Sequence, residues 1–400
     1  MTASAQPTAE LVPVRESRRS GHRGHRTRLD AFPRDPLRRW AMRLAFAAPY
    51  FIISQLAFGS GAVSALNTPN EQLLAKVAGI GWDRADPEWI GQIFPPISTV
   101  LAIVIPGGRF GLAVAGALIA GIFLQKLVEI MVQRRFPART VVILTVALAA
   151  NPLFAYTVTE NFAAFLGLAF FGLAIADIVR FVAWRNTLSG FRAGTLLMLA
   201  TFSDLSGLVY VMTSALAAPF LRLGRAGEKG ARGANVLVIV YPTVSALGAI
   251  LFLGWLFTGD PLASFGHGLL DDAPTRWARL SKVLMSVNGL FLVLPVLSAW
   301  LVALIVRRAG SIVVSTLVFV AILVAFVLGL LPSGSAGNAF ILMTVMAIAL
   351  VPTARGPRTT VLVDIVAIAQ IVIAWGGALT RDTIVTWMTA VSAAFGGWPF

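Results

Sequence analysis

The stretch FGLAVAGALIAGIFLQKLVEIMVQ, residues 110–133, is apolar for most of its length and is followed directly by Arg134 and Arg135. A membrane-spanning helix needs about 20 mostly apolar residues, so this stretch predicts one span with a basic pair at its end. Its small residues, GLAVAGALIAG at 111–121, are typical of a helix face that packs closely against a neighbouring helix. They are not a phosphate-binding loop, because the lysine of such a loop is missing.

Similar apolar stretches recur along the chain, which is 57% hydrophobic and 12% charged, with a mean hydropathy of +0.81. This composition predicts an all-α, polytopic integral membrane protein with about 11 transmembrane helices. Residues 1–41 are polar and rich in Pro and Arg, which predicts a disordered basic tail, and residues 42–400 form a single transmembrane domain. The predicted spans cover residues 42–64, 110–133, 140–157, 162–182, 193–202, 206–221, 235–257, 283–306, 311–331, 337–352 and 359–378.

Two apolar stretches are too short to span and are expected to lie at the membrane interface. The first, FPPISTVLAIVIPGG at 94–108, belongs to the long first outer loop, residues 65–109. The second, TIVTWMTAVSAAFGGWPF at 383–400, closes the chain, and its Trp387 and Trp398 suit an interfacial helix.

The basic residues predict the orientation. With the N-terminus placed inside, 24 of the 32 Lys and Arg residues fall on the cytoplasmic side, as the positive-inside rule requires. The sequence therefore predicts a cell-membrane protein with a cytoplasmic N-terminus, and the net charge of +14 reflects sidedness rather than nucleic-acid binding. Most acidic residues then lie at or near the outer face: Glu71, Asp83, Asp86, Glu88, Glu160, Asp204, Asp260, Asp271, Asp272 and Asp382.

The residue inventory narrows the possible chemistry. Because the chain has no cysteine and only three histidines, thiol chemistry and a clustered histidine metal site are not expected. No cofactor is expected, although the acidic group Asp83, Asp86 and Glu88 could bind a divalent cation.

The first outer loop gathers groups that can act on sugars. Its carboxylates could serve as a general base toward an acceptor hydroxyl, Arg84 could bind phosphate, and Trp82 or Trp89 could stack on a sugar ring. The alternative is a solvated loop whose charges form surface ion pairs. Taken alone, the loop favours this second interpretation.

The order of features resembles the GT-C superfamily of membrane glycosyltransferases. A first span precedes a long acidic outer loop and a PPI element, Phe94 to Ile97, followed by the span that ends in Arg134 and Arg135. The next hairpin is expected to turn at NPLFAYTVTEN, residues 151–161, with Asn151, Pro152 and Glu160 at the outer face. A later span ends in LFTGDPLASF, similar to a GDPL segment of many such enzymes. The resemblance covers residues 42–270.

The resemblance implies an inverting glycosyltransferase with a carboxylate base and a lipid-phosphate-linked sugar donor, acting outside the membrane on a cell-envelope glycan or glycolipid. In the family an Asp, often within an Asp-Glu pair, follows the first span, whereas this chain has Asn70 and Glu71 there. Since an asparagine cannot act as a base, the resemblance passes the role to Asp86 first, then Glu71, with Glu88 and Asp83 as further candidates.

The remaining candidates are charged or aromatic residues on the outer side. For the leaving lipid phosphate they are Arg84, His267, Arg276, Arg279 and Lys282, although Arg276 and Arg279 could simply snorkel from a span that starts near Lys282. Asp204, at a break between two short apolar runs, is either a functional acid or a helix N-cap. Asp177 and Asp364 are expected to be structural.

Two other functions stay open. The chain could be a transporter or flippase of a lipid-linked or small substrate, although only the break at Asp204 suggests a discontinuous helix and no internal repeat is visible. It could also be an inactive GT-C-like assembly factor, for which Asn70 is the argument.

Overall fold

The structure is a computed structural model of the whole chain. It describes residues 31–59, 67–82, 89–133, 135–184, 187–218, 231–265, 272–305, 307, 309–329 and 357–394. Every regular element within these ranges is a helix, which confirms the predicted all-α class for the part of the chain that is described. The predicted span at 337–352, Trp398 and most of the N-terminal tail lie outside these ranges.

Five described helices are long and apolar enough to cross a membrane: α1 (Pro36–Gly59), α6 (Gly108–Gln133), α12 (Ala231–Thr258), α14 (Val287–Ile305) and α17 (Pro357–Leu379). The bent pair α7 (Ala138–Ala149) and α8 (Pro152–Glu160) makes a sixth if it counts as one span. The chain is therefore a multi-pass membrane protein by composition and helix length. The other long elements are α9 (Phe162–Trp184), α10 (Thr187–Ser203), α11 (Ser206–Ala217) and α15 (Ala309–Val327), and a total of eleven spans stays a prediction.

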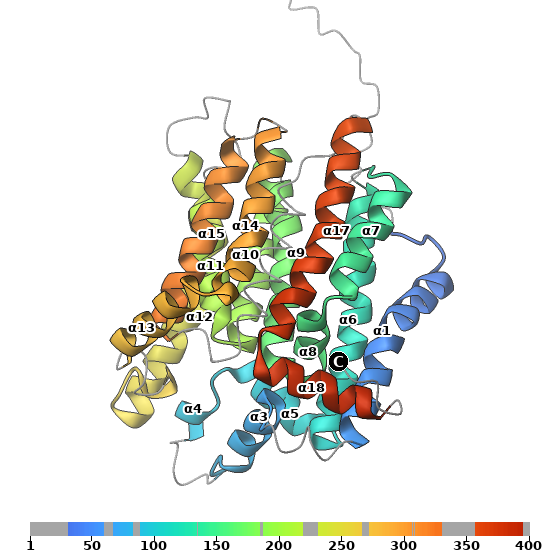
Figure 1. Cartoon of the computed structure of the whole chain (residues 1–400). Coiled ribbons are helices and arrows are strands. Elements are labelled where there is room, and N and C mark those ends of the chain that lie inside the picture. Colours follow the sequence, from blue (N-terminus) through green and yellow to red (C-terminus); the bar gives the residue numbers. More distant parts are fainter. Residues whose placement is uncertain are drawn as a thin grey trace, which may run out of the picture.

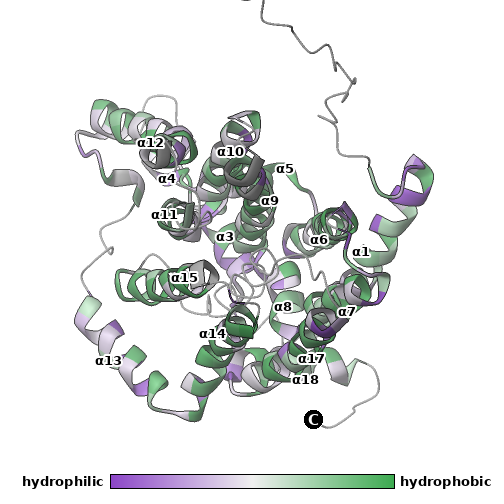
Figure 2. Ribbon diagram, turned by 90° about the horizontal axis from the view of Figure 1, so that it is seen from above, coloured by the Kyte–Doolittle hydropathy of each residue, from purple (hydrophilic) through white to green (hydrophobic). Residues whose placement is uncertain are grey.

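The long helices run side by side, and short helices gather toward one end of the bundle (Figure 1). Seen along the bundle, apolar residues cover most of α12, α14, α15 and α17 (Figure 2). The short helices are α3 (Pro69–Ala78), α4 (Trp89–Gln92), α5 (Pro96–Val104), η2 (Ala263–Phe265), α13 (Ala273–Leu284) and α18 (Asp382–Ala393). The short helices expected in the first outer loop and near the end of the chain are thus present, and we call their location the short-helix end.

Aromatic rings from α1, α6, α8 and α9 pack together where these four helices meet. Phe154 packs edge-on against both Tyr50, at 5.7 Å between ring centroids, and Phe165, at 5.6 Å. Phe123 lies 6.4 Å from each of Phe154 and Phe165. The hydroxyl of Tyr50 donates to the Ala149 carbonyl at 2.9 Å, so the one polar atom of this cluster is satisfied.

The small-residue stretch of α6 packs closely against its neighbours, as predicted. A Cβ atom built on Gly121 would lie 2.2 Å from the Arg43 carbonyl oxygen of α1, and one built on Gly116 would lie 2.2 Å from the Val158 carbonyl oxygen of α8. Because both obstacles are backbone atoms, a larger residue requires the helices to move apart.

Gly121→Ala is therefore expected to destabilise the protein by about 1–3 kcal/mol, the usual cost of overpacking. Thermal unfolding in detergent measures it as a lower midpoint. The matched control is Gly248→Ala in α12, where a Cβ meets nothing within 4 Å and alanine should be neutral or slightly stabilising. Equal midpoints for the two variants would contradict the close α1–α6 contact.

Three sequence predictions in the first half of the chain need correction. Helix α1 begins at Pro36 rather than residue 42, because Asp35 accepts the Leu37 N–H at 3.0 Å and the Arg39 N–H bonds the Asp35 carbonyl. The predicted span at 140–157 is two helices bent by 57°, because Asn151 accepts the N–H groups of Leu153 and Phe154 and thereby starts a new helix at Pro152. Since α8 continues to Glu160, the hairpin turns at Asn161, and Asn151 is buried.

Two further corrections concern the chain's later half. The predicted span at 283–306 corresponds to α14, which begins at Val287 rather than residue 283, because Val283 and Leu284 belong to the preceding helix α13. Trp387 of α18 is only 3% exposed and packs edge-on against Tyr156 at 5.5 Å. This tryptophan anchors α18 to the bundle instead of facing the membrane interface.

Candidate functional site

An ion triad joins three segments at the short-helix end. Arg109, at the start of α6, donates from Nε and Nη2 to the two carboxylate oxygens of Glu160, at 3.1 and 3.2 Å. Its Nη1 donates to Oε1 of Glu71 at 3.1 Å. The guanidinium is thus shared by the first residues of α3 and the last residue of α8, which connects the first outer loop to the bundle.

Burial increases from Glu71 through Arg109 to Glu160. The side chains are 25%, 10% and 2% exposed, respectively. A buried carboxylate is costly unless it is paired and hydrogen-bonded, so the two-point contact with Arg109 is what allows Glu160 to remain inside. Two carboxylates face one guanidinium, and Glu71 is the more exposed member that a molecule at the surface can reach.

Asn70 holds α3 in place against the α8–α9 turn. Its amide donates to the Thr159 carbonyl at 2.9 Å, and its carbonyl oxygen accepts the Phe162 N–H at 2.8 Å. The side chain is 1% exposed. An amide supplies both a donor and an acceptor here, which explains in physical terms why an asparagine occupies the position where the resemblance leads one to expect an aspartate.

The local sequence also fixes Glu71. Thr68 precedes α3 with an extended backbone and Pro69 begins the helix, an arrangement that suits proline because its missing N–H is not needed there. Oε2 of Glu71 accepts the Thr68 N–H at 3.0 Å. Both oxygens of Glu71 are therefore held, one by backbone and one by Arg109.

Buried polar and aromatic side chains surround Glu160. The hydroxyl of Thr68 and the indole N–H of Trp387 lie beside its carboxylate, although neither meets hydrogen-bond geometry with a described group. Thr68 is 0% and Trp387 3% exposed. Thr68 and Trp387 therefore enclose the buried side of the ion triad.

Lys76 connects α3 to the PPI element. Its ammonium donates to the Phe94 carbonyl, and the Phe94 ring packs 4.6 Å from Phe265, which follows the GDPL segment. Burial lowers the pKa of Lys76 from its ordinary value, because the charged ammonium loses hydration there. The two segments that carry the resemblance thus lie against each other, next to the Glu71 helix.

Of the predicted catalytic residues, the structure describes only Glu71. Asp83, Arg84, Asp86, Glu88 and His267 lie outside the described residues. Trp89, in α4, packs against Trp82 at 5.7 Å between centroids. In the described ranges no three His, Asp or Glu side chains gather as a metal would require.

The predicted phosphate ligands on α13 do not act as a group. Arg276 packs against Gly329 at the end of α15, and its Nη1 is buried without a hydrogen-bond partner in the described part of the chain. Arg279 and Lys282 are exposed. Of these three cations, Arg276 is therefore the one whose guanidinium is buried against the bundle.

Asp204 lies at the break between α10 and α11 and accepts the Ser206 N–H at 3.0 Å. The Ser206 hydroxyl also donates to it. Of the two interpretations given to this acid, the helix-capping one therefore accounts for its contacts.

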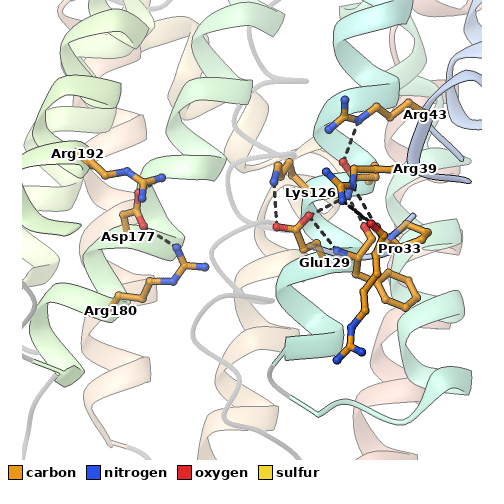
Figure 3. A network of polar contacts seen from close by, with 11 residues as sticks. Pro33, Arg39, Arg43, Lys126, Glu129, Asp177, Arg180 and Arg192 are labelled. Atoms are coloured by element: carbon orange, nitrogen blue, oxygen red, sulfur yellow. Dashed lines mark hydrogen bonds and ion pairs between the residues drawn. The ribbon is translucent and has the colours of Figure 1, made fainter. Parts of the chain in front are cut away.

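A second polar network, which sequence reasoning missed, lies at the opposite end of α6 (Figure 3). Glu129 pairs with Lys126 at 2.9 Å and accepts from the Gln125 amide at 3.0 Å, while Arg43 donates to Gln125 at 3.0 Å. Gln125 also donates to the Phe32 carbonyl. The sequence signal for this network is the presence of three polar residues, Gln125, Lys126 and Glu129, inside one apolar stretch. The network attaches the start of the described chain to α6.

Asp177 and Asp364 are buried and ion-paired at this same end. Asp177 contacts Arg180 at 2.8 Å and Arg192 at 3.4 Å (Figure 3), and Asp364 contacts Arg139 at 3.4 Å. Their contacts fit the structural role expected for them, since each acid joins neighbouring helices or turns.

Comparisons of the chain with protein families, with curated proteins and with solved structures find no match. Its function is therefore inferred from the chemistry of the ion triad and its surroundings.

Proposed function

We propose that this protein is a membrane glycosyltransferase that moves a sugar from a lipid-phosphate-linked donor to a glycan or glycolipid acceptor of the cell envelope. The observation that carries the proposal is the ion triad Glu71–Arg109–Glu160. It lies beside Trp387 at the end of the bundle where the first outer loop, the PPI element and the GDPL segment meet. We place this end outside the cell membrane and the N-terminus in the cytoplasm.

The proposed reaction inverts the anomeric carbon. A carboxylate removes the proton of the acceptor hydroxyl, the freed oxygen attacks the anomeric carbon, and the lipid phosphate leaves from the opposite side. Asp86 is the first candidate for the base, because Glu71 already accepts from Thr68 and Arg109. Glu88 and Asp83 follow as alternatives, and a divalent cation held by these loop carboxylates would serve the phosphate.

The supporting residues then have distinct tasks. Arg109 holds the carboxylate of Glu71 in a fixed orientation, so Glu71 can accept a hydrogen bond from a sugar hydroxyl through its remaining lone pairs. Arg276, whose buried Nη1 has no hydrogen-bond partner among the described residues, would receive charge on the departing phosphate together with Arg84 and His267. Trp89, packed on Trp82, offers a face for a sugar ring.

Asp86→Asn is expected to lower the transfer rate at least about 100-fold, the usual contribution of a general base. The assay follows sugar transfer from a radiolabelled polyprenyl-phosphate sugar in membranes. Glu71→Gln should reduce the rate less, because the substituted amide keeps an acceptor oxygen for the Thr68 N–H. The matched control is Asp272→Asn, an exposed carboxylate before α13, which should leave the rate unchanged. Full activity of the Asp86, Glu71, Glu88 and Asp83 variants would rule out the proposed base.

One observation favours a transporter or flippase as a second candidate. The helix pair α7–α8 is bent by 57°, and α10–α11 breaks at Asp204, whereas only the second break was visible in the sequence. Broken helices with polar groups at the break are a feature of transporters. Substrate movement across proteoliposomes, without sugar transfer, would favour this candidate. A protein that binds the donor but never transfers its sugar would instead support an assembly factor.

A further inference from the structure

Helix α13 stands at the edge of the bundle, apart from the ion triad. It lies toward the short-helix end and, seen along the bundle, at the periphery, where polar and apolar residues alternate along it (Figures 1 and 2). It leads directly into α14, one of the helices long and apolar enough to span a membrane. Its position therefore brings it close to the level at which α14 would enter the membrane.

One side of α13 is cationic and unpaired. Arg279 and Lys282, three residues apart and so on neighbouring positions of the helix surface, are exposed. Neither forms an ion pair with any carboxylate among the described residues. Lys and Arg side chains close to a membrane surface are attracted to anionic lipid headgroups.

The other side of α13 is apolar, and the bundle covers only part of it. Leu280 is 5% exposed, whereas Trp277 and Val283, which flank it on the helix surface, are 59% and 39% exposed. This exposed strip continues into α14 through a further set of exposed apolar side chains: Met285, Val287, Leu290, Leu297 and Leu301. The apolar strip of α13 is continuous with the exposed apolar face of α14, a candidate membrane span. We therefore expect lipid to cover both surfaces.

We propose that α13 lies in the plane of the membrane surface and binds the phosphates of anionic phospholipids through Arg279 and Lys282. Trp277 and Val283 rest at the boundary between headgroups and acyl chains, where amphipathic helices with tryptophan bind. The cations select anionic headgroups over zwitterionic ones. This role of α13 does not depend on sugar transfer.

The absence of cysteine allows a direct local test. The exposed Ala278 is replaced in Ala278→Cys, labelled with bimane, and the full-length protein is placed in phosphatidylcholine nanodiscs. One set of nanodiscs also contains brominated phosphatidylglycerol, and the other contains brominated phosphatidylcholine at the same mole fraction. In both brominated lipids the bromine lies close to the headgroup. We expect quenching by the anionic lipid to be about threefold stronger and the preference to weaken as salt is added.

In the charge variant Arg279→Gln/Lys282→Gln, made on the same labelled chain, both brominated lipids should quench the bimane fluorescence equally. The matched control Arg38→Gln/Arg358→Gln removes two exposed charges near the other end of the bundle and should keep the preference. Equal quenching by both lipids in the unsubstituted labelled chain would overturn headgroup selection. Weak quenching by either lipid would overturn the membrane-surface position and point to water or another protein beside α13.

Discussion

Arg109→Met is expected to destabilise the protein by about 3–5 kcal/mol, the usual cost of removing one partner of a buried ion pair. The substitution leaves two carboxylates facing each other, one of which, on Glu160, is 2% exposed. Coulomb repulsion and lost hydration then act together, because no other cation contacts Glu160 in the described residues. Thermal unfolding in detergent at neutral pH measures the loss.

The control Arg38→Met removes an arginine of 82% exposure whose ion pair with Asp35 lies at the surface, and surface pairs contribute about 0–1 kcal/mol. Combining Arg109→Met with Glu160→Gln should recover part of the stability, because the stranded charge is removed. If Arg109→Met costs no more than Arg38→Met, the triad does not connect the first outer loop to the bundle.

Asn70→Asp should destabilise the protein by about 2–3 kcal/mol rather than create a better catalyst. An aspartate can still accept the Phe162 N–H, but it cannot donate to the Thr159 carbonyl as the amide does at 2.9 Å. The Thr159 carbonyl then loses its hydrogen-bond donor in a buried position. The aspartate also adds a negative charge close to Thr159, the residue that precedes Glu160. Unfolding and sugar transfer are measured on the same preparation.

The matched control is Gln72→Glu, the same amide-to-acid change on an exposed side chain of the same helix. It should change stability by no more than about 0.5 kcal/mol. A stable Asn70→Asp variant with raised transfer activity would show that this position holds a missing catalytic acid, contrary to the structural role assigned to Asn70.

Local patterns in the sequence predict the elements that local physics decides. The apolar stretches of α6 and α17, the short helix at the PPI element and the break at Asp204 all follow from composition, helix length and capping. The bend after Ala149 does not, because an Asn-Pro pair can either end a hairpin or start a second helix, and only the buried surroundings of Asn151 decide between them.

The pairing of charges could not be predicted, because it joins distant parts of the chain. Arg109 is separated from Glu71 by 38 residues and from Glu160 by 51. Both Arg109 and Glu160 stand out in the sequence as charges at the outer face, yet nothing in their spacing indicates that the start of α6 meets the end of α8. In the sequence, Asn70 occupies the position where the resemblance leads one to expect a catalytic aspartate. In the structure, its two hydrogen bonds hold α3 against the turn between α8 and α9.

The anomeric configuration of the product is the decisive measurement for the proposed function. The purified protein in nanodiscs is given polyprenyl-phosphate sugars and cell-envelope acceptors, and the product is analysed by NMR. We expect transfer with inversion at the anomeric carbon, lost in Asp86→Asn and kept in Asp272→Asn. Retention of configuration, or no transfer from any donor by a folded protein, would contradict the proposal.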